Sequence, residues 1–204
     1  MKKLIKRIFL VLIGAFSLSL VLLGYIYIKD ENLLIYATGT NEKAFLNSTW
    51  LMSPNEIRRA NNAYLEKPEW ELFFTEPDVV NPNRYSSFKQ KDIELWGHST
   101  EVEYSFFDKK LFQYYIGMKS YDADKDEKEV LAILNYRFGS QLKIEKKSKH
   151  LLKEYEWGYK NQSIRFWISK DSKDKNYHFG ITVKYLPYYN EIKKISEAEK
   201  KNYF

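Results

Sequence analysis

An uncharged apolar stretch near the start of the chain constrains this protein more than any other feature. Residues 8–28 contain no Asp, Glu, Lys or Arg. At about 1.5 Å per residue, a helix of this length reaches about 30 Å, the thickness of the hydrocarbon core of a bilayer. We therefore predict that residues 8–28 form a single transmembrane helix.

The charges on either side of this stretch predict its orientation. Four basic residues precede it, namely Lys2, Lys3, Lys6 and Arg7. Only Lys29 follows directly, and it is succeeded by Asp30 and Glu31. Because cytoplasmic flanks carry the excess of Lys and Arg, we expect the N-terminus in the cytoplasm and the rest of the chain in the periplasm of a bacterial cell.

A cleaved signal peptide is the competing interpretation of the same stretch. Its apolar region would be shorter, roughly 7–15 residues, and would end close to a small-x-small cleavage site. The nearest such site, Ala37-Thr38-Gly39, lies well past the apolar end. We therefore favour an uncleaved anchor in the inner membrane. Attachment through a lipid on cysteine is excluded because the chain contains no cysteine.

The net charge of +6 belongs to the anchor and does not indicate nucleic-acid binding. Five of the 33 basic residues lie at or before Lys29, while all 27 acidic residues follow it. The remaining 28 basic residues nearly balance those 27 acidic ones, so the exported part has a net charge of about +1. A basic excess confined to a membrane anchor sets topology, and we expect no nucleic acid among the partners.

Length and composition predict the division of the chain. We assign residues 1–29 to a cytoplasmic stub and anchor, 30–49 to a tether, 50–190 to one extracytoplasmic domain, and 191–204 to a charged tail. A domain of this size can bury a sizeable core without disulfide bonds. The absence of cysteine also removes zinc–cysteine sites and thiol nucleophiles.

The first helix of the domain has the sharpest local signal. Ser53 is followed by Pro54 and, three residues after the serine, by Glu56. A serine cap, a proline at the first helical position and a glutamate that closes a capping box together predict a helix from Pro54 to about Ala63. A catalytic role for Ser53 is a far less frequent explanation of this pattern.

Residues 66–92 lack a clear period and contain three prolines, which predicts a long connection. Five aromatic residues in it argue against disorder, because disordered segments contain few of them. They are our candidate partner-binding residues: Trp70, Phe73, Phe74, Tyr85 and Phe88. Packing of this segment on its own domain is the alternative interpretation.

Strict alternation then predicts a hairpin over residues 100–118. Val102, Tyr104 and Phe106 share one face of the first strand, and Glu101, Glu103 and Ser105 share the other. We expect Glu101 and Glu103 to lie on the polar face of the strand, a more frequent arrangement than a catalytic carboxylate pair. A turn at residues 108–110 would lead to a returning strand over residues 111–118.

A second helix is predicted after this hairpin. Asp122, Asp124 and Asp126 resemble the start of a calcium-binding loop, but the sixth and twelfth positions hold Glu127 and Ile133 instead of Gly and Glu. We expect Asp126 to cap a helix instead. Its buried face would consist of Val130, Leu131, Leu134 and Phe138, and Gly139 would end it.

The last third of the chain returns to a period of two. Apolar and aromatic residues alternate over residues 155–159, 164–168 and 177–185, which predicts an antiparallel meander. Pro187 would end the last strand. A lysine-rich run over residues 141–153 is typical of a solvated surface, with contact to anionic lipid as an alternative. We expect an α+β domain with two main helices on one face of an antiparallel sheet.

Two groups of residues carry a resemblance to known proteins. The first is the helix start Trp50-Leu51-Met52-Ser53-Pro54-Asn55-Glu56-Ile57. The second is a set of spaced apolar residues: Val130, Leu134, Phe138, Gly139, Tyr155, Trp157, Ile164, Phe166, Val183 and Tyr185. The chain resembles small exported bacterial α+β domains, such as the lipoprotein of the outer-membrane β-barrel assembly machine and the β-lactamase-inhibitor protein. The resemblance implies a binding or assembly domain that is not an enzyme.

No pattern of catalytic or metal-binding residues emerges from the sequence. His98, His150 and His178 lie far apart, and no glycine-rich phosphate loop or G-x-S-x-G sequence occurs. We expect no cofactor. The sequence favours a non-enzymatic binding or scaffold protein of the envelope, with the inner membrane and an envelope protein as partners. The alternatives are a small-molecule or lipid-binding protein, an unrecognised hydrolase, or an immunity protein against a periplasmic toxin.

Overall fold

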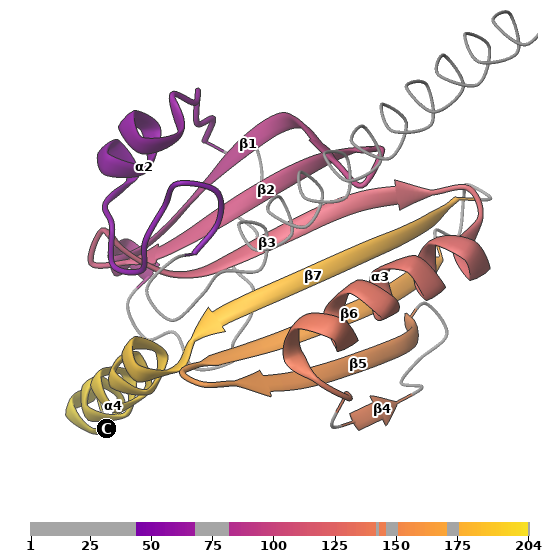
Figure 1. Ribbon diagram of the computed structural model, residues 1–204. Helices are drawn as coiled ribbons and strands as arrows, with labels where there is room; N and C mark the ends of the chain where they lie inside the picture. Colours follow the sequence, from indigo (N-terminus) through magenta and orange to yellow (C-terminus); the bar gives the residue numbers. More distant parts are fainter. Residues whose placement is uncertain (1–43, 68–81, 142, 146–150, 171–175, 204) are drawn as a thin grey trace, which may run out of the picture. The chain divides into compact units, whose positions relative to one another are not determined.

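The computed structural model describes residues 44–67, 82–141, 143–145, 151–170 and 176–203 (Figure 1). The expected transmembrane helix at residues 8–28 and the expected tether up to residue 43 lie outside this range. Within the described residues, no helix has both the length and the apolar character needed to cross a membrane.

The described residues form an α+β domain with a seven-stranded sheet and three α-helices. Every pair of neighbouring strands is antiparallel, and the order across the sheet is β1-β2-β3-β7-β6-β5-β4. The strands are β1 (Tyr85–Leu95), β2 (His98–Phe107), β3 (Lys110–Ser120), β4 (Lys143–Glu145), β5 (Leu151–Tyr159), β6 (Gln162–Lys170) and β7 (Tyr177–Tyr185). The helices are α2 (Pro54–Asn61), α3 (Ala123–Phe138) and α4 (Leu186–Tyr203), and a short 3-10 helix, η1 (Pro82–Arg84), precedes β1.

Helix α2 begins as the sequence predicts. The Ser53 hydroxyl accepts a hydrogen bond from the Glu56 backbone at 3.4 Å, and the Glu56 carboxylate accepts one from the Ser53 backbone at 2.7 Å. The Ser53 hydroxyl also donates to the Glu56 carboxylate at 2.7 Å, and the two bonds that this carboxylate accepts lower the pKa of Glu56 because they favour its charged form. The helix ends at Asn61, two residues earlier than predicted, with Asn62 in the left-handed conformation.

One face of the sheet, which we call the covered face, carries the main core. A row of apolar side chains crosses it in register: Trp157, Ile164, Val183, Tyr114 and Tyr104. The exposed fraction of each is 1% or less. Figure 1 shows α3 lying along β5 and β6 over this face, and the Trp157 indole donates hydrogen bonds to Asn135 and to the Gly139 carbonyl at the end of that helix.

The other half of the covered face packs against the segment before α2. The Phe45 ring contacts Tyr104 and Tyr114, and the Trp50 ring stacks on Tyr114 and Tyr185. Ala44, Phe45 and Ser48 are fully buried. Residues 44–49, which the sequence assigned to a tether, are therefore part of the packed domain.

Strand β1 corrects the expected connection over residues 66–92. Tyr85 already pairs with Phe107 in β2, and the pairing continues to Leu95 with an irregularity between Gln90 and Ile93. Residues 82–84 form η1, and residues 68–81 of the expected connection lie outside the described residues. The sheet therefore has three strands before α3 and four after it.

Two further expectations about helices were wrong in detail. The cap of α3 is Asp122, whose carboxylate accepts a hydrogen bond from the Lys125 backbone at 3.2 Å, so the cap lies four residues before the one expected at Asp126. Val130 and Leu134 are buried as expected, whereas Leu131 and Phe138 are half-buried. Residues 191–204, expected as a charged tail with a short helix through Ile195 and Ala198 as an alternative, belong to the longer helix α4 as far as Tyr203.

Helix α4 closes a second apolar cluster at one end of the sheet (Figure 1). Tyr188 and Ile192 pack with Phe107 and Phe112, and the Tyr188 hydroxyl donates a hydrogen bond to the Phe107 carbonyl at 3.1 Å. Burial and nearby acidic groups raise the pKa of Tyr188 to about 12, which keeps this hydroxyl a donor at neutral pH.

Candidate binding surface

The structure separates the aromatic residues that the sequence proposed as one partner-binding set. Trp70, Phe73 and Phe74 lie outside the described residues. Tyr85 and Phe88 are half-buried in β1. Because they are three residues apart in a strand, they point to opposite faces of the sheet and do not form one surface together.

The neighbours of these two rings confirm the separation. Tyr85 packs edge-on against Phe107 in the α4 cluster, with ring centroids 4.8 Å apart. Phe88 packs against Phe106 on the covered face at 5.8 Å, and the Arg58 guanidinium of α2 lies 5.4 Å above the Phe88 ring. Both side chains therefore join packing clusters of their own domain.

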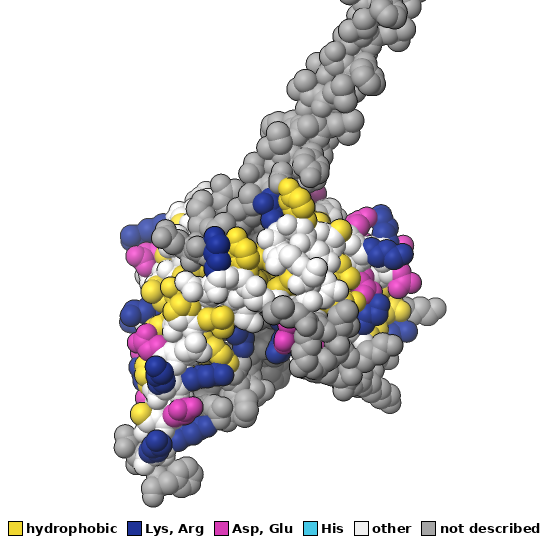
Figure 2. Space-filling view, turned by 60° about the horizontal axis from the view of Figure 1, so that its bottom comes forward, with side chains coloured by type: hydrophobic (Ala, Val, Ile, Leu, Met, Phe, Trp, Pro, Cys, Tyr) yellow, Lys and Arg dark blue, Asp and Glu magenta, His cyan; other side chains and the backbone are white. Residues whose placement is uncertain are grey.

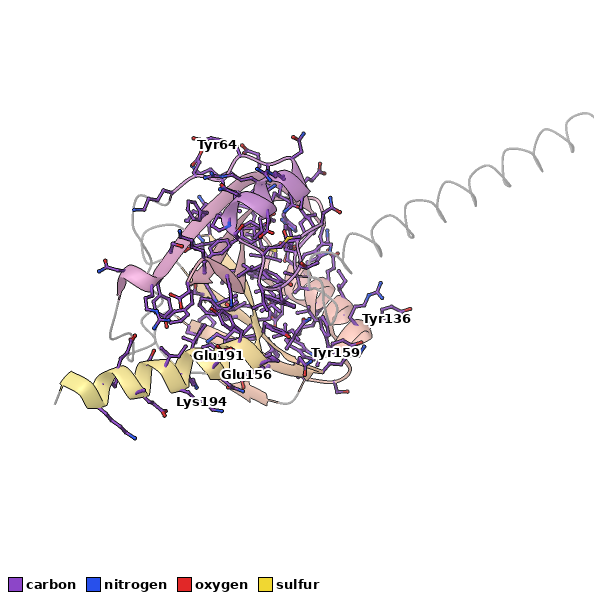
Figure 3. All side chains as sticks on the ribbon, turned by 90° about the vertical axis from the view of Figure 1, so that its left-hand side faces the viewer. Tyr64, Tyr136, Glu156, Tyr159, Glu191 and Lys194 are labelled. Atoms are coloured by element: carbon purple, nitrogen blue, oxygen red, sulfur yellow. The ribbon has the colours of Figure 1, made fainter. Side chains whose placement is uncertain are left out.

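The most exposed tyrosines do not gather at one place either. Tyr64, Tyr121 and Tyr136 are exposed by 80%, 83% and 68%. Figure 3 shows Tyr64 and Tyr136 on opposite sides of the domain. Isolated exposed aromatic residues are normal on a protein surface and do not mark a site.

A serine, an aspartate and a histidine lie together beside the first turn of α3, but their order does not suit nucleophilic catalysis. The buried Ser120 hydroxyl is 2.6 Å from one Asp126 oxygen, and the His98 Nε2 atom is 3.7 Å from the other. In a catalytic triad the imidazole stands between hydroxyl and carboxylate and takes the hydroxyl proton. Here the carboxylate occupies the middle position, so the imidazole does not reach the serine oxygen.

The neighbouring residue Glu127 joins α3 to the sheet. Its carboxylate accepts hydrogen bonds from the Lys153 ammonium at 2.7 and 2.8 Å and from the Tyr155 hydroxyl. Burial and the Glu127 carboxylate both raise the pKa of Tyr155, so this tyrosine stays protonated and donates. Lys153, which the sequence placed in a solvated or lipid-facing run, thus takes part in helix docking.

The face opposite α2 and α3 has an unusual centre, formed by two glycines. Gly117 in β3 and Gly180 in β7 are directly paired across the sheet. We call this side the glycine face. A Cβ atom at Gly180 would come within 2.3 Å of the Trp167 ring, and one at Gly117 within 3.0 Å of the Tyr115 hydroxyl. The lack of side chains therefore allows both aromatic rings to lie close against the sheet.

Tyr115 and Trp167 together form what we call the aromatic floor. Their rings are nearly parallel, at 9°, with centroids 5.9 Å apart. Both residues are half-buried, so part of each is accessible to solvent. The two rings are stacked on each other, and the accessible part of such a pair can stack further against planar or cationic groups.

Three charged residues border the floor on the side of β1 and β2. Tyr115 in β3 is paired with Glu103 in β2, which is paired with Lys89 in β1. Gly117 in β3 is paired with Glu101 in β2. The Lys89 ammonium lies 3.3 Å from Glu101 and 3.9 Å from Glu103. The side chain of Glu101 is 42% exposed, whereas that of Glu103 is 1% exposed.

Glu103 departs from the sequence expectation of a solvated residue on the polar face. Neither of its carboxylate oxygens has a hydrogen bond of regular geometry within the described residues, although the Ser87 hydroxyl lies close enough to lower the pKa of Glu103. Burial raises the pKa of Glu103, while the nearby Ser87 hydroxyl and Lys89 ammonium act in the opposite direction. A buried carboxylate without hydrogen bonds is costly, and such groups concentrate at functional sites.

On the opposite side, towards β5, one cation again contacts two carboxylates. The Arg165 guanidinium contacts the buried Glu154 carboxylate at 2.8 Å and the Glu156 carboxylate at 3.2 Å. Both glutamates lie in β5 on the glycine face, and Glu154 is directly opposite Trp167. Carboxylates therefore outnumber cations on both sides of the floor, and Glu103, at 3.9 Å from Lys89, is held less closely by its cation than Glu154 is by Arg165 at 2.8 Å.

The sequence analysis did not identify the aromatic floor. The signal that would have found it is a glycine inside each of two strands, which often marks a close approach of another group. Their pairing across the sheet depends on the register of β3 with β7, and the sequence does not reveal that register.

The described residues hold no group of three or more His, Asp or Glu placed to bind a metal ion. Figure 2 shows basic and acidic side chains interspersed over the surface in view, without one extended field of either sign. No family model, no curated protein and no solved structure matches the chain significantly. The aromatic floor and its carboxylates are thus the best candidate site that the geometry of this protein supplies.

Proposed function

We propose that this protein is a membrane-anchored, non-enzymatic binding or scaffold protein of the bacterial cell envelope. Residues 8–28 hold it in the inner membrane as a single span, with the N-terminus in the cytoplasm and the α+β domain in the periplasm. Support comes from the length of the uncharged stretch and from the basic residues that precede it. An anchor of this kind restricts the partners to the membrane and to nearby envelope proteins.

The observation that carries the binding function is the aromatic floor beside an unsatisfied buried carboxylate. Tyr115 and Trp167 offer partly accessible rings, and Glu103 keeps a raised pKa beside them. Aromatic residues are enriched at the centres of protein interfaces, where rigid rings supply contact area at low entropic cost. We therefore assign partner binding to the glycine face.

Site-specific photocrosslinking in intact cells tests this assignment. A photoreactive residue at Ser169, two positions from Trp167 on the glycine face, should give a crosslinked product with one envelope protein. The same residue at Lys128, exposed on α3, serves as the control and should not. Replacement of Trp167 by Ala should abolish the Ser169 product. Equal products from both positions, or none from Ser169, would contradict the proposal.

The topology requires an experiment of its own. A reporter that is active only outside the cytoplasm should be active when it is fused after Phe204. The mass of the fusion protein should equal that of the full chain, 24.5 kDa, plus that of the reporter. An inactive reporter on a fusion protein that is present in the cell would overturn the periplasmic assignment. A shortened chain would show that the N-terminal segment is cleaved.

A further inference from the structure

The charges beside the aromatic floor are unequal in number. One ammonium group, that of Lys89, serves two carboxylates, at 3.3 Å from Glu101 and 3.9 Å from Glu103. Neither Glu103 oxygen has a hydrogen bond of regular geometry within the described residues. The cluster therefore lacks one positive charge, and a buried carboxylate is tolerated best when a cation compensates it.

The two carboxylates also face the floor itself. Glu103 is the direct register partner of Tyr115, and Glu101 is that of Gly117, over which the Tyr115 ring lies. Burial raises the pKa of Tyr115, and the negative charges of Glu101 and Glu103 raise it further. A cation above the Tyr115 ring would thus be attracted by the ring and by both carboxylates.

We infer that the aromatic floor binds an arginine side chain of the partner protein, with the guanidinium stacked over Tyr115 and Trp167 and paired with Glu101. Glu101 is the accessible carboxylate, and Glu103 lies beside it as a second negative charge. This inference rests on the proposed partner-binding function of the glycine face.

Arginine suits this surface better than lysine. A guanidinium is planar, stacks on aromatic rings and forms two parallel hydrogen bonds to one carboxylate. It is also more weakly hydrated than an ammonium, so less hydration is lost when it lies on a ring. Glu101 already accepts a hydrogen bond from Lys89 at 3.3 Å, but its side chain is 42% exposed, more than those of Glu154 and Glu156 on the β5 side, so Glu101 is the carboxylate that an incoming cation reaches most easily.

Fluorine NMR of the full chain, labelled with 5-fluorotryptophan and held in detergent micelles, tests the inference. The chain has five tryptophans, and the Trp167→Phe variant assigns the signal of interest. The probe is the peptide acetyl-Gly-Arg-Gly-amide, and its citrulline counterpart is a neutral control of the same shape. The Trp167 signal should shift saturably with the arginine peptide and stay unchanged with the citrulline peptide.

Variants of single carboxylates sharpen the test. The Glu101→Gln substitution should weaken binding of the arginine peptide about tenfold or more, because it removes a charge-assisted hydrogen bond. The Glu103→Gln substitution should weaken it less, since Glu103 acts through its charge alone. The Glu129→Gln substitution, on exposed α3, removes the same charge far from the floor and should leave binding unchanged.

Equal responses to the arginine and citrulline peptides, equal binding of a matching lysine peptide, or no Trp167 shift with any peptide would overturn the inference. The photocrosslinking experiment does not depend on the arginine peptide, so its result can be compared with each of these outcomes. A crosslinked partner that depends on Trp167 together with a silent arginine peptide would retain the binding function and reject arginine as its ligand. Loss of both signals would reject both.

Discussion

The two faces of the sheet show opposite ways of handling a buried carboxylate. On the covered face, Glu127 accepts hydrogen bonds from Lys153 and Tyr155. On the glycine face, Glu103 is equally buried but has no hydrogen bond of regular geometry among the described residues. A satisfied buried group contributes to the fold, whereas an unsatisfied one is retained at a cost to stability. Glu154, also buried on the glycine face, is paired with Arg165, so the difference concerns Glu103 alone and supports the proposed assignment of binding to its surroundings.

The strongest test of this difference between the two faces compares two neighbouring residues of β6. Phe166 is fully buried on the covered face, and Trp167 is half-buried on the glycine face. Phe166→Ala should lower the free energy of unfolding by about 3–5 kcal/mol, because it leaves a cavity in the core. Trp167→Ala should lower it by only about 1–2 kcal/mol, since solvent can fill the space. Urea denaturation of both variants measures the difference, and equal losses would show that the floor is part of the core.

The carboxylates provide the next comparison. Glu127→Gln should destabilise the fold by about 2 kcal/mol, because Lys153 loses its charged partner and Tyr155 a strong acceptor. Glu103→Gln should leave stability unchanged or raise it, because it removes a buried charge that lacks hydrogen bonds. The same denaturation experiment checks both. A large loss with Glu103→Gln would reveal a structural role for that carboxylate.

Alanine substitutions at the two paired glycines, Gly117 and Gly180, should differ in their effect on stability. Gly180→Ala should destabilise the fold by about 1–2 kcal/mol, since its Cβ would meet the Trp167 ring at 2.3 Å and the ring must move. Gly117→Ala should cost less, because its Cβ would meet the Tyr115 hydroxyl and ring at 3.0–3.3 Å and that ring needs to move by only a small distance. Thermal unfolding gives the stabilities, and a changed fluorine signal of Trp167 should accompany Gly180→Ala alone.

The smallest expected effect is the pH dependence due to Glu103. Its pKa is raised in the folded protein from the ordinary value of 4.5, so the folded state binds the proton more tightly than the unfolded state. The contribution of Glu103 to the free energy of unfolding is complete below pH 4.5. It is lost as the pH rises through the pKa that Glu103 has in the folded protein. The advantage of the Glu103→Gln variant over the natural protein should therefore grow from pH 4 to pH 7. An advantage that shrinks over this range would contradict the raised pKa.

Local signals predicted the elements that form from local interactions. The capping box of Ser53 and Glu56 located the start of α2, and the alternation of Val102, Tyr104 and Phe106 located β2. In both cases, neighbours within four residues decide the structure. The α+β class and the antiparallel sheet were confirmed for the same reason.

The elements that were missed lack such signals. Strand β1 has an irregularity between Gln90 and Ile93 and many polar residues, so its alternation is broken. Helix α4 contains Pro187 in its first turn, where proline is tolerated, although the sequence analysis took that proline as a terminator. The cap of α3 shifted to Asp122 because Asp126 interacts with Ser120 and His98 instead.

By itself, the sequence determined the α+β class, the alternating strands, the start of α2 and a strong expectation of a membrane anchor, because each depends on residues close together in the chain. Only the tertiary structure decided where Glu103 and the aromatic floor lie. Gly117 and Gly180 are paired through strands that are far apart in sequence, and Trp167 reaches Tyr115 across β7. Such a site depends on the register between non-local strands, which follows from the packing of the whole sheet and from no single stretch of the chain.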